Sequence, residues 1–144
     1  MVRIKLSTLA MDVDITFQEK VVFVRGFSGT GKSLFVSELQ QVLEKNIGIL
    51  ETNAKITVVN NSAIVEYIRE VESDKPTVYV CDENYAEEVL AKVKGLNVYA
   101  VIVSRKKHAD WNYSYKSVYQ ASRENGKTII KTVYSFSKSK YKEV

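Results

Sequence analysis

Eight residues of this sequence, Gly26 to Ser33, combine glycines, a lysine and a hydroxyl in an order suited to phosphate binding. The stretch reads G-F-S-G-T-G-K-S and satisfies the pattern G-x-x-x-x-G-K-[ST] at every required position. Glycines allow successive backbone N–H groups to turn inward around an anion, and lysine adds a mobile positive charge. The spacing therefore predicts a loop that surrounds the phosphates of a nucleotide.

The end of this stretch also carries groups that suit a magnesium nucleotide. We expect Lys32 to reach the β- and γ-phosphates and the Ser33 hydroxyl to bind Mg²⁺, with the helix N-terminus adding its positive dipole end. The residues expected to contact the nucleotide are Gly26, Phe27, Ser28, Gly29, Thr30, Gly31, Lys32, Ser33 and Leu34.

Two carboxylates follow an apolar run further along the chain. Asp82 and Glu83 come directly after residues 78–81, which read V-Y-V-C. A magnesium nucleotide site needs a carboxylate at the carboxyl end of a neighbouring parallel strand, so Asp82 is the candidate metal ligand. Glu83 is suited to polarise an attacking water. The alternative is that both residues begin the next helix, where carboxylates favour the dipole in any protein.

These residues need a scaffold in which strands and helices alternate. Apolar, β-branched runs alternate with segments of helical spacing, which predicts a parallel sheet with helices on both faces. In the first helical segment Leu34, Phe35, Leu39, Val42 and Leu43 fall on one face, and in the second Ile64, Ile68 and Val71 do so. The expected strands lie within 20–26, 54–60, 77–83 and 97–105, and the helices within 32–46, 62–71 and 84–95.

Two further regions have the pattern of hairpins. Residues 2–6 and 13–17 alternate apolar and charged residues, and Asn125-Gly126 between two strand-like runs is a strong hairpin signal. The expected fold is α/β, a three-layer sandwich with a mainly parallel sheet plus N-terminal and C-terminal β-hairpins. The 144 residues are expected to form one domain, with a core of about 20–105 and a basic C-terminal extension at 106–144.

Composition restricts the class of protein. The chain is 45% hydrophobic and 26% charged, and no apolar run approaches the roughly 18 residues of a membrane span, so we expect a cytoplasmic protein without a membrane. Cys81 lies in an apolar run and is expected to be a buried small hydrophobe. Residues 1–104 carry a net charge of −3 and residues 105–144 one of +7, which suggests a polyanion or an acidic partner.

The phosphate-binding stretch and the Asp-Glu pair resemble the Walker A and Walker B motifs of the P-loop nucleoside triphosphatases. The adjacent acidic residues are similar to those of the additional-strand division, which contains the AAA-type, RecA-type and ABC-type ATPases. Over roughly residues 20 to 105, the resemblance implies a core strand order of 2-3-4-1 and a minimal single-domain member. It also implies that the fourth strand ends in a polar residue near the γ-phosphate, a place that Ser104 and Arg105 match.

The resemblance implies ATP and Mg²⁺ as cofactors and ATP hydrolysis as the activity. Lys32, Glu83 and Arg105 would be catalytic, and Ser33 and Asp82 would hold the metal. In such proteins an arginine often acts on the nucleotide of a neighbouring subunit. The resemblance is therefore compatible with a homo-oligomer. The chain carries no sequence like the ABC signature "LSGGQ" and has no room for the helical lid of AAA proteins.

Three functional hypotheses remain open from the sequence. The first is an ATP-binding protein and Mg-dependent ATPase that couples its nucleotide state to a partner through the basic residues 105–142. The second is a small-molecule or nucleoside kinase, since similar loops occur in such kinases. The third is a nucleotide-gated module that binds nucleic acid or protein, because cations and aromatic rings alternate between Arg105 and Tyr119.

Overall fold

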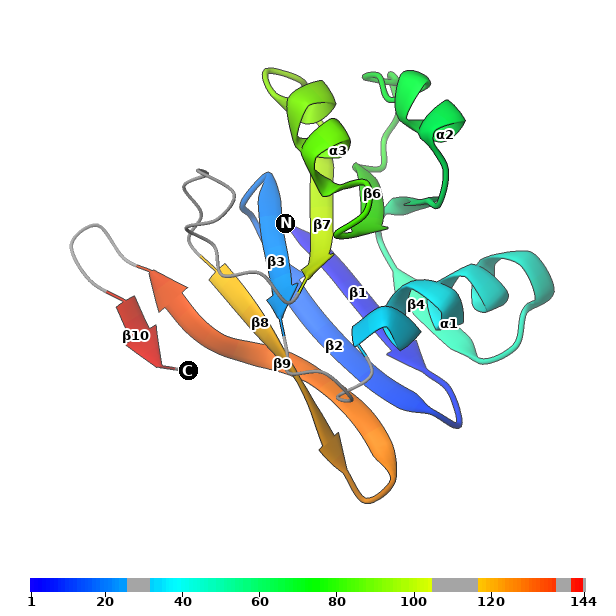
Figure 1. Cartoon of the computed structure of the whole chain (residues 1–144), viewed down its shortest axis with the longest axis vertical. Helices are drawn as coiled ribbons and strands as arrows, with labels where there is room; N and C mark the ends of the chain where they lie inside the picture. Colours follow the sequence, from blue (N-terminus) through cyan, green and yellow to red (C-terminus); the bar gives the residue numbers. More distant parts are fainter. Residues whose placement is uncertain (26–31, 105–116, 137–140, 144) are drawn as a thin grey trace.

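The computed structural model describes residues 1–25, 32–104, 117–136 and 141–143. Within these residues the chain forms ten strands and three helices (Figure 1). The strands are β1 Val2–Ser7, β2 Met11–Phe17, β3 Val21–Arg25, β4 Ile49–Thr52, β5 Lys55–Val59, β6 Thr77–Asp82, β7 Tyr99–Ser104, β8 Ser117–Glu124, β9 Lys127–Phe136 and β10 Tyr141–Glu143. The helices are α1 Lys32–Lys45, α2 Ser62–Glu66 and α3 Ala86–Val93.

All ten of these strands belong to one sheet. The order is β4-β1-β2-β9-β8-β3-β7-β6-β5, and β10 pairs with β9 off this path. Four neighbouring strands, β5, β6, β7 and β3, run parallel to one another. Their apolar, β-branched composition suits strands that are covered on both faces.

The helices divide between the two faces of this parallel section. Val22 and Val24 of β3 pack in the same cluster as Phe35 and Leu39 of α1, whereas Phe23 packs in the cluster that contains the buried residues of α3. Because successive side chains of a strand point to opposite faces, α1 covers one face and α3 the other. Figure 1 shows α2 and α3 at the top of the view and α1 apart from them, lower at the right.

Antiparallel pairs build the rest of the sheet. β1 pairs with β2 and with β4, and β9 pairs with β8 and with β10. In β1 the apolar residues Val2, Ile4 and Leu6 are buried while Arg3 and Lys5 are exposed, which is the alternation of a sheet with one solvated face. The hairpin turn between β8 and β9 contains Asn125 and Gly126, both with positive φ.

The predicted fold class is wrong, because the sheet is mixed rather than mainly parallel. The four core strands do follow the expected order, but the hairpins are not additions to a finished sandwich. β8 pairs in parallel with β3, and β9 pairs in parallel with β2, so the C-terminal hairpin lies in the middle of the sheet. The error arises because pairing between strands that are distant in sequence leaves no trace in local composition.

The two ends of the strand order are close in sequence. β4 and β5 are the terminal strands of the sheet, yet Asn53 and Ala54 alone separate them along the chain. The sheet must therefore curl so that its ends approach each other. The apolar face of α1 packs inside this curl, in one cluster with residues from β1, β2, β3, β5, β6 and β7. Both sections of the sheet thus share a hydrophobic core around α1.

Candidate phosphate-binding site

The predicted phosphate-binding loop connects a central strand to the helix in the core. β3 ends at Arg25 and α1 begins at Lys32, so Lys32, Ser33 and Leu34 form the first turn of α1. The intervening residues Gly26, Phe27, Ser28, Gly29, Thr30 and Gly31 lie outside the described residues, as does Arg105. The strand-to-helix context that this motif requires is therefore present on both sides of the loop.

The candidate metal ligand lies at the same edge of the sheet. Asp82 is the last residue of β6 and is in register with Val103 of β7, which in turn is in register with Val24 of β3. One row further on, Ser104 is opposite Arg25. β7 therefore separates the strand of Asp82 from the strand of the loop, a spacing of roughly 10 Å between strand axes.

A backbone amide fixes the orientation of the Asp82 carboxylate. Asp82 Oδ1 accepts a hydrogen bond from Asn84 N at 2.9 Å, and the Asp82 carbonyl accepts one from Tyr85 N at 3.3 Å. Asn84 was not among the residues predicted from the sequence. An Asp followed by a short polar turn is the available signal, because Asp side chains bond to the backbone two residues on.

Glu83 lies in the turn that follows β6 and is half-buried. α3 begins only at Ala86, and its first turn contains Glu87 and Glu88. These two residues, not Asp82 and Glu83, are the carboxylates that complement the dipole of α3. Asp82 therefore ends β6 and Glu83 follows it directly, and neither belongs to the first turn of α3.

Cys81 is fully buried, as expected, and has the chemistry of a hydrophobic residue. Burial, with a smaller contribution from the negative charge of Asp82, raises the pKa of the Cys81 thiol to about 12. A thiol with this pKa is protonated at neutral pH and is not a nucleophile. Cys81 therefore supports the strand that positions Asp82 and has no place in the chemistry.

β8 is the second neighbour of the strand that leads into the loop. Gln120 is in register with Arg25, and β8 continues past this point to Glu124. The C-terminal hairpin thus borders the end of β3 on the side opposite β7. The position of β8 beside β3 was not predicted, because these strands are distant in sequence and no local signal indicates their pairing.

The donor chemistry at this edge suits Mg²⁺. The Asp82 carboxylate and the Ser33 hydroxyl are oxygen ligands of the kind Mg²⁺ prefers, and it commonly binds one or two carboxylates together with nucleotide phosphates. In the described part of the chain, no group of three or more His, Cys, Asp and Glu residues could hold a metal by itself. Mg²⁺ held by Asp82 and Ser33 would complete its shell with water and with phosphate oxygens.

Among the described residues, no helix is long and apolar enough to cross a membrane. In comparisons with known proteins, the sequence matches no protein-family model and no curated protein sequence.

Proposed function

We propose that this chain is an ATP-binding protein and Mg-dependent ATPase that couples its nucleotide state to a partner. The observation that carries the proposal is the arrangement at the carboxyl edge of the parallel strands. The glycine-rich loop joins β3 to α1, and Asp82 ends β6 at the same edge with β7 in between. Ligands of open α/β sheets bind outside the carboxyl ends of the strands.

Each residue of the site has a distinct role in this proposal. Lys32 and the loop amides stabilise the charge that develops on the transferred phosphoryl group. Ser33 and Asp82 would hold Mg²⁺, which would supply positive charge beside the phosphates. Ser104 is the last residue of β7, between the strands that carry these groups, and in this proposal it would contact the γ-phosphate. Arg105 adds positive charge there, either in the same subunit or toward a second copy of the chain.

The position of Glu83 favours water as the acceptor of the phosphoryl group. Glu83 follows the metal ligand directly and lies outside α3, at the edge where the γ-phosphate would be. A carboxylate there accepts a proton from an attacking water. The basic residues 105–142 are the proposed contact for an acidic partner or a nucleic acid.

The test is phosphate release from magnesium ATP, with nucleotide affinity measured in parallel. We expect Lys32→Ala to lose nucleotide binding. Glu83→Gln should bind nucleotide and lose turnover by about 10²- to 10⁴-fold, because a general base is removed. Glu87→Gln is the matched control, since it neutralises an exposed carboxylate in the first turn of α3. Tight binding by the wild type without phosphate release would contradict the ATPase assignment.

A further inference from the structure

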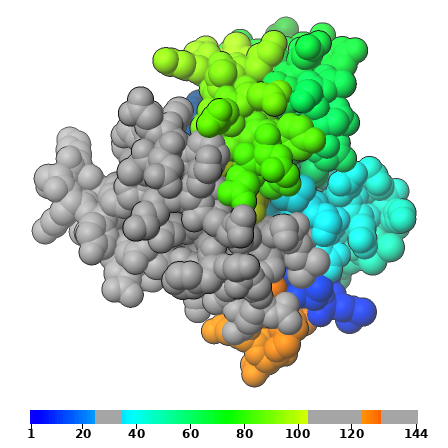
Figure 2. Space-filling model, viewed as in Figure 1, coloured from blue at the N-terminus to red at the C-terminus, as the bar shows by residue number. Residues whose placement is uncertain are grey.

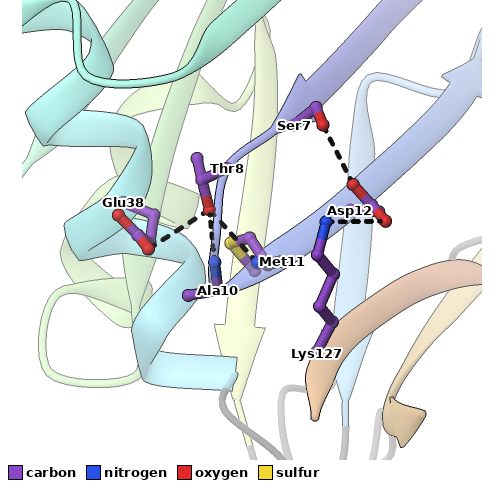
Figure 3. Close-up of polar contacts among 7 residues, drawn as sticks. All are labelled: Ser7, Thr8, Ala10, Met11, Asp12, Glu38 and Lys127. Carbon is purple, nitrogen blue, oxygen red and sulfur yellow. Dashed lines mark hydrogen bonds and ion pairs between the residues drawn. The ribbon is translucent and has the colours of Figure 1, made fainter. Parts of the chain in front are cut away.

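The hydroxyl of Thr8 joins α1 to the turn between β1 and β2. Thr8 is 9% exposed, and its Oγ1 accepts the N–H groups of Ala10 and Met11, both at 3.1 Å (Figure 3). The same hydroxyl donates to Glu38 Oε1 of α1 at 3.2 Å. A threonine hydroxyl has one donor and two acceptor sites, so all of its hydrogen-bonding capacity is used.

The same turn is also joined to β9. The Ala10 carbonyl accepts a hydrogen bond from Thr128 N at 2.9 Å. Asp12 Oδ1 accepts from Ser7 Oγ at 3.1 Å, and Asp12 Oδ2 lies 3.6 Å from Lys127 Nζ (Figure 3). In the space-filling view, the blue atoms of this region lie between the surface of α1 and the orange residues 124–130 (Figure 2).

The glutamate in this set of contacts belongs to the helix that begins at the phosphate-binding motif. Glu38 lies six residues after Lys32, roughly 9 Å along the axis of α1. Lys32 and Glu38 belong to one uninterrupted helix, in which Phe35 and Leu39 are fully buried, so the two positions are rigidly linked. A displacement of its first turn therefore reaches Glu38.

We propose that the contacts Glu38–Thr8–Ala10–Thr128, here called the Thr8 contact chain, couple nucleotide binding to the β8–β9 turn at Glu124 to Lys127. The inference rests on the proposed function, since it takes the loop before α1 to be the nucleotide site. Ligand binding there fixes the position of α1, and the Thr8 contact chain passes this constraint to the start of β9. Because coupling is reciprocal, a partner held at the β8–β9 turn changes nucleotide affinity by the same factor.

Amide hydrogen exchange with and without a non-hydrolysable magnesium ATP analogue tests this coupling. In the wild type, we expect the nucleotide to slow exchange at the start of α1 and also at residues 10–12 and 127–130. Glu38→Ala should keep the first effect and lose the second. Glu44→Ala is the matched control, because it removes an exposed carboxylate of the same helix that is bonded to Gln40 instead.

A second pair of variants removes the hydroxyl while keeping the size of the side chain. Thr8→Val removes all three hydrogen bonds of the hydroxyl. It should weaken the nucleotide effect on residues 127–130 by at least about fivefold, the scale of a single hydrogen bond, and Thr8→Ser should restore it. If Thr8→Val fails to fold, the Glu38→Ala and Glu44→Ala comparison still decides, because neither variant alters the turn.

The outcomes separate this inference from the proposed function. Nucleotide binding by the wild type with no change at residues 127–130 would overturn the coupling and leave the ATPase proposal intact. Equal loss of the distant effect in Glu38→Ala and Glu44→Ala would overturn the route through Thr8. Absence of nucleotide binding by the wild type would reject the proposed function and the coupling together.

Discussion

Two adjacent residues of β6 lie in different environments. These environments set the protonation state of the Cys81 thiol and the orientation of the Asp82 carboxylate. Cys81 is fully buried among the residues that pack against α3, whereas Asp82 is half-buried at the strand end with a backbone amide on its carboxylate. The thiol is kept neutral and the carboxylate is oriented. A strand that ends at a ligand site supplies both effects, because its last residue leaves the core while the one before remains inside.

The Cys81 thiol predicts a loss of stability at alkaline pH. Its pKa is raised from 9.0 to about 12 in the folded protein, so the folded state binds the proton more tightly than the unfolded state. This contribution is fully present below pH 9 and is lost as the pH rises toward 12, by about 1.4 kcal/mol per pH unit. Urea unfolding of wild type and Cys81→Ala should be measured from pH 8 to 11. The free energy of unfolding of the wild type should fall relative to that of Cys81→Ala as the pH rises. A pH-independent difference would contradict the prediction.

Gly48 predicts a backbone effect at the end of α1. Its φ is +109°, and an added Cβ would lie 2.8 Å from Thr8 Cγ2 and 3.0 Å from the Ser7 carbonyl oxygen. Gly48→Ala should therefore lower the free energy of unfolding by about 2–3 kcal/mol. Gly95→Ala is the control, since Gly95 has a φ of +80° with no atom within 4 Å of the added Cβ. It should cost about 1 kcal/mol, from backbone strain alone. Equal losses in chemical denaturation would show that the contact with Thr8 is unimportant.

At the scale of elements, α1 holds the two sections of the sheet together. Phe35 is fully buried in the shared core, whereas Leu43 on the same helix is 43% exposed. We expect Phe35→Ala to destabilise the protein by about 3–5 kcal/mol, and Leu43→Ala by less than about 1 kcal/mol. Thermal and urea unfolding measure both variants. Similar losses for the two would mean that α1 is not packed into the curl of the sheet.

The helices show how far sequence periodicity predicts structure. The spacing of apolar residues correctly predicted α1. It also grouped Leu43 with the core-facing residues, which is wrong: the sheet covers a narrower face of the helix, and Leu43 is 43% exposed. The second helix was predicted to reach Val71. α2 ends at Glu66, while Ile68 is buried outside any helix and Val71 is 46% exposed. Neighbouring elements bury Ile68 although it is not part of a helix. The spacing of apolar residues cannot distinguish this case from a residue on a buried helix face.

The strands and the site show the same limit. Apolar runs located β3, β5, β6 and β7, and the rule that ligands bind at carboxyl strand ends placed Asp82 and the loop at one edge. The short strand β4 has no distinctive pattern and was missed. The Asn84 amide that holds Asp82 was also missed, although an Asp followed by a short polar turn is a local signal for such a bond.

At the scale of the whole molecule, the C-terminal hairpin decides whether the sheet is continuous. β8 and β9 are the strands between β3 and β2, and Ile130 of β9 is 1% exposed in the core shared with α1. Without them, β2 and β3 would each present an unpaired edge. The N-terminal hairpin would then be joined to the parallel section only through α1 and the link between β4 and β5.

This arrangement predicts that a fragment of residues 1–104 does not fold cooperatively. It loses the parallel pairs of β8 with β3 and of β9 with β2, and it loses Ile130 from the core shared with α1. The net stability of a domain is only about 5–15 kcal/mol, so the loss of two central strands and their core contacts is large by comparison. We expect circular dichroism melting to show no sharp transition for this fragment. A fragment of residues 1–136, which keeps β8 and β9 and removes β10, should melt cooperatively like the full chain. A sharp transition in the shorter fragment at a similar temperature would contradict this prediction. It would mean that the parallel section is stable without the hairpin and that β8 and β9 are not required for folding.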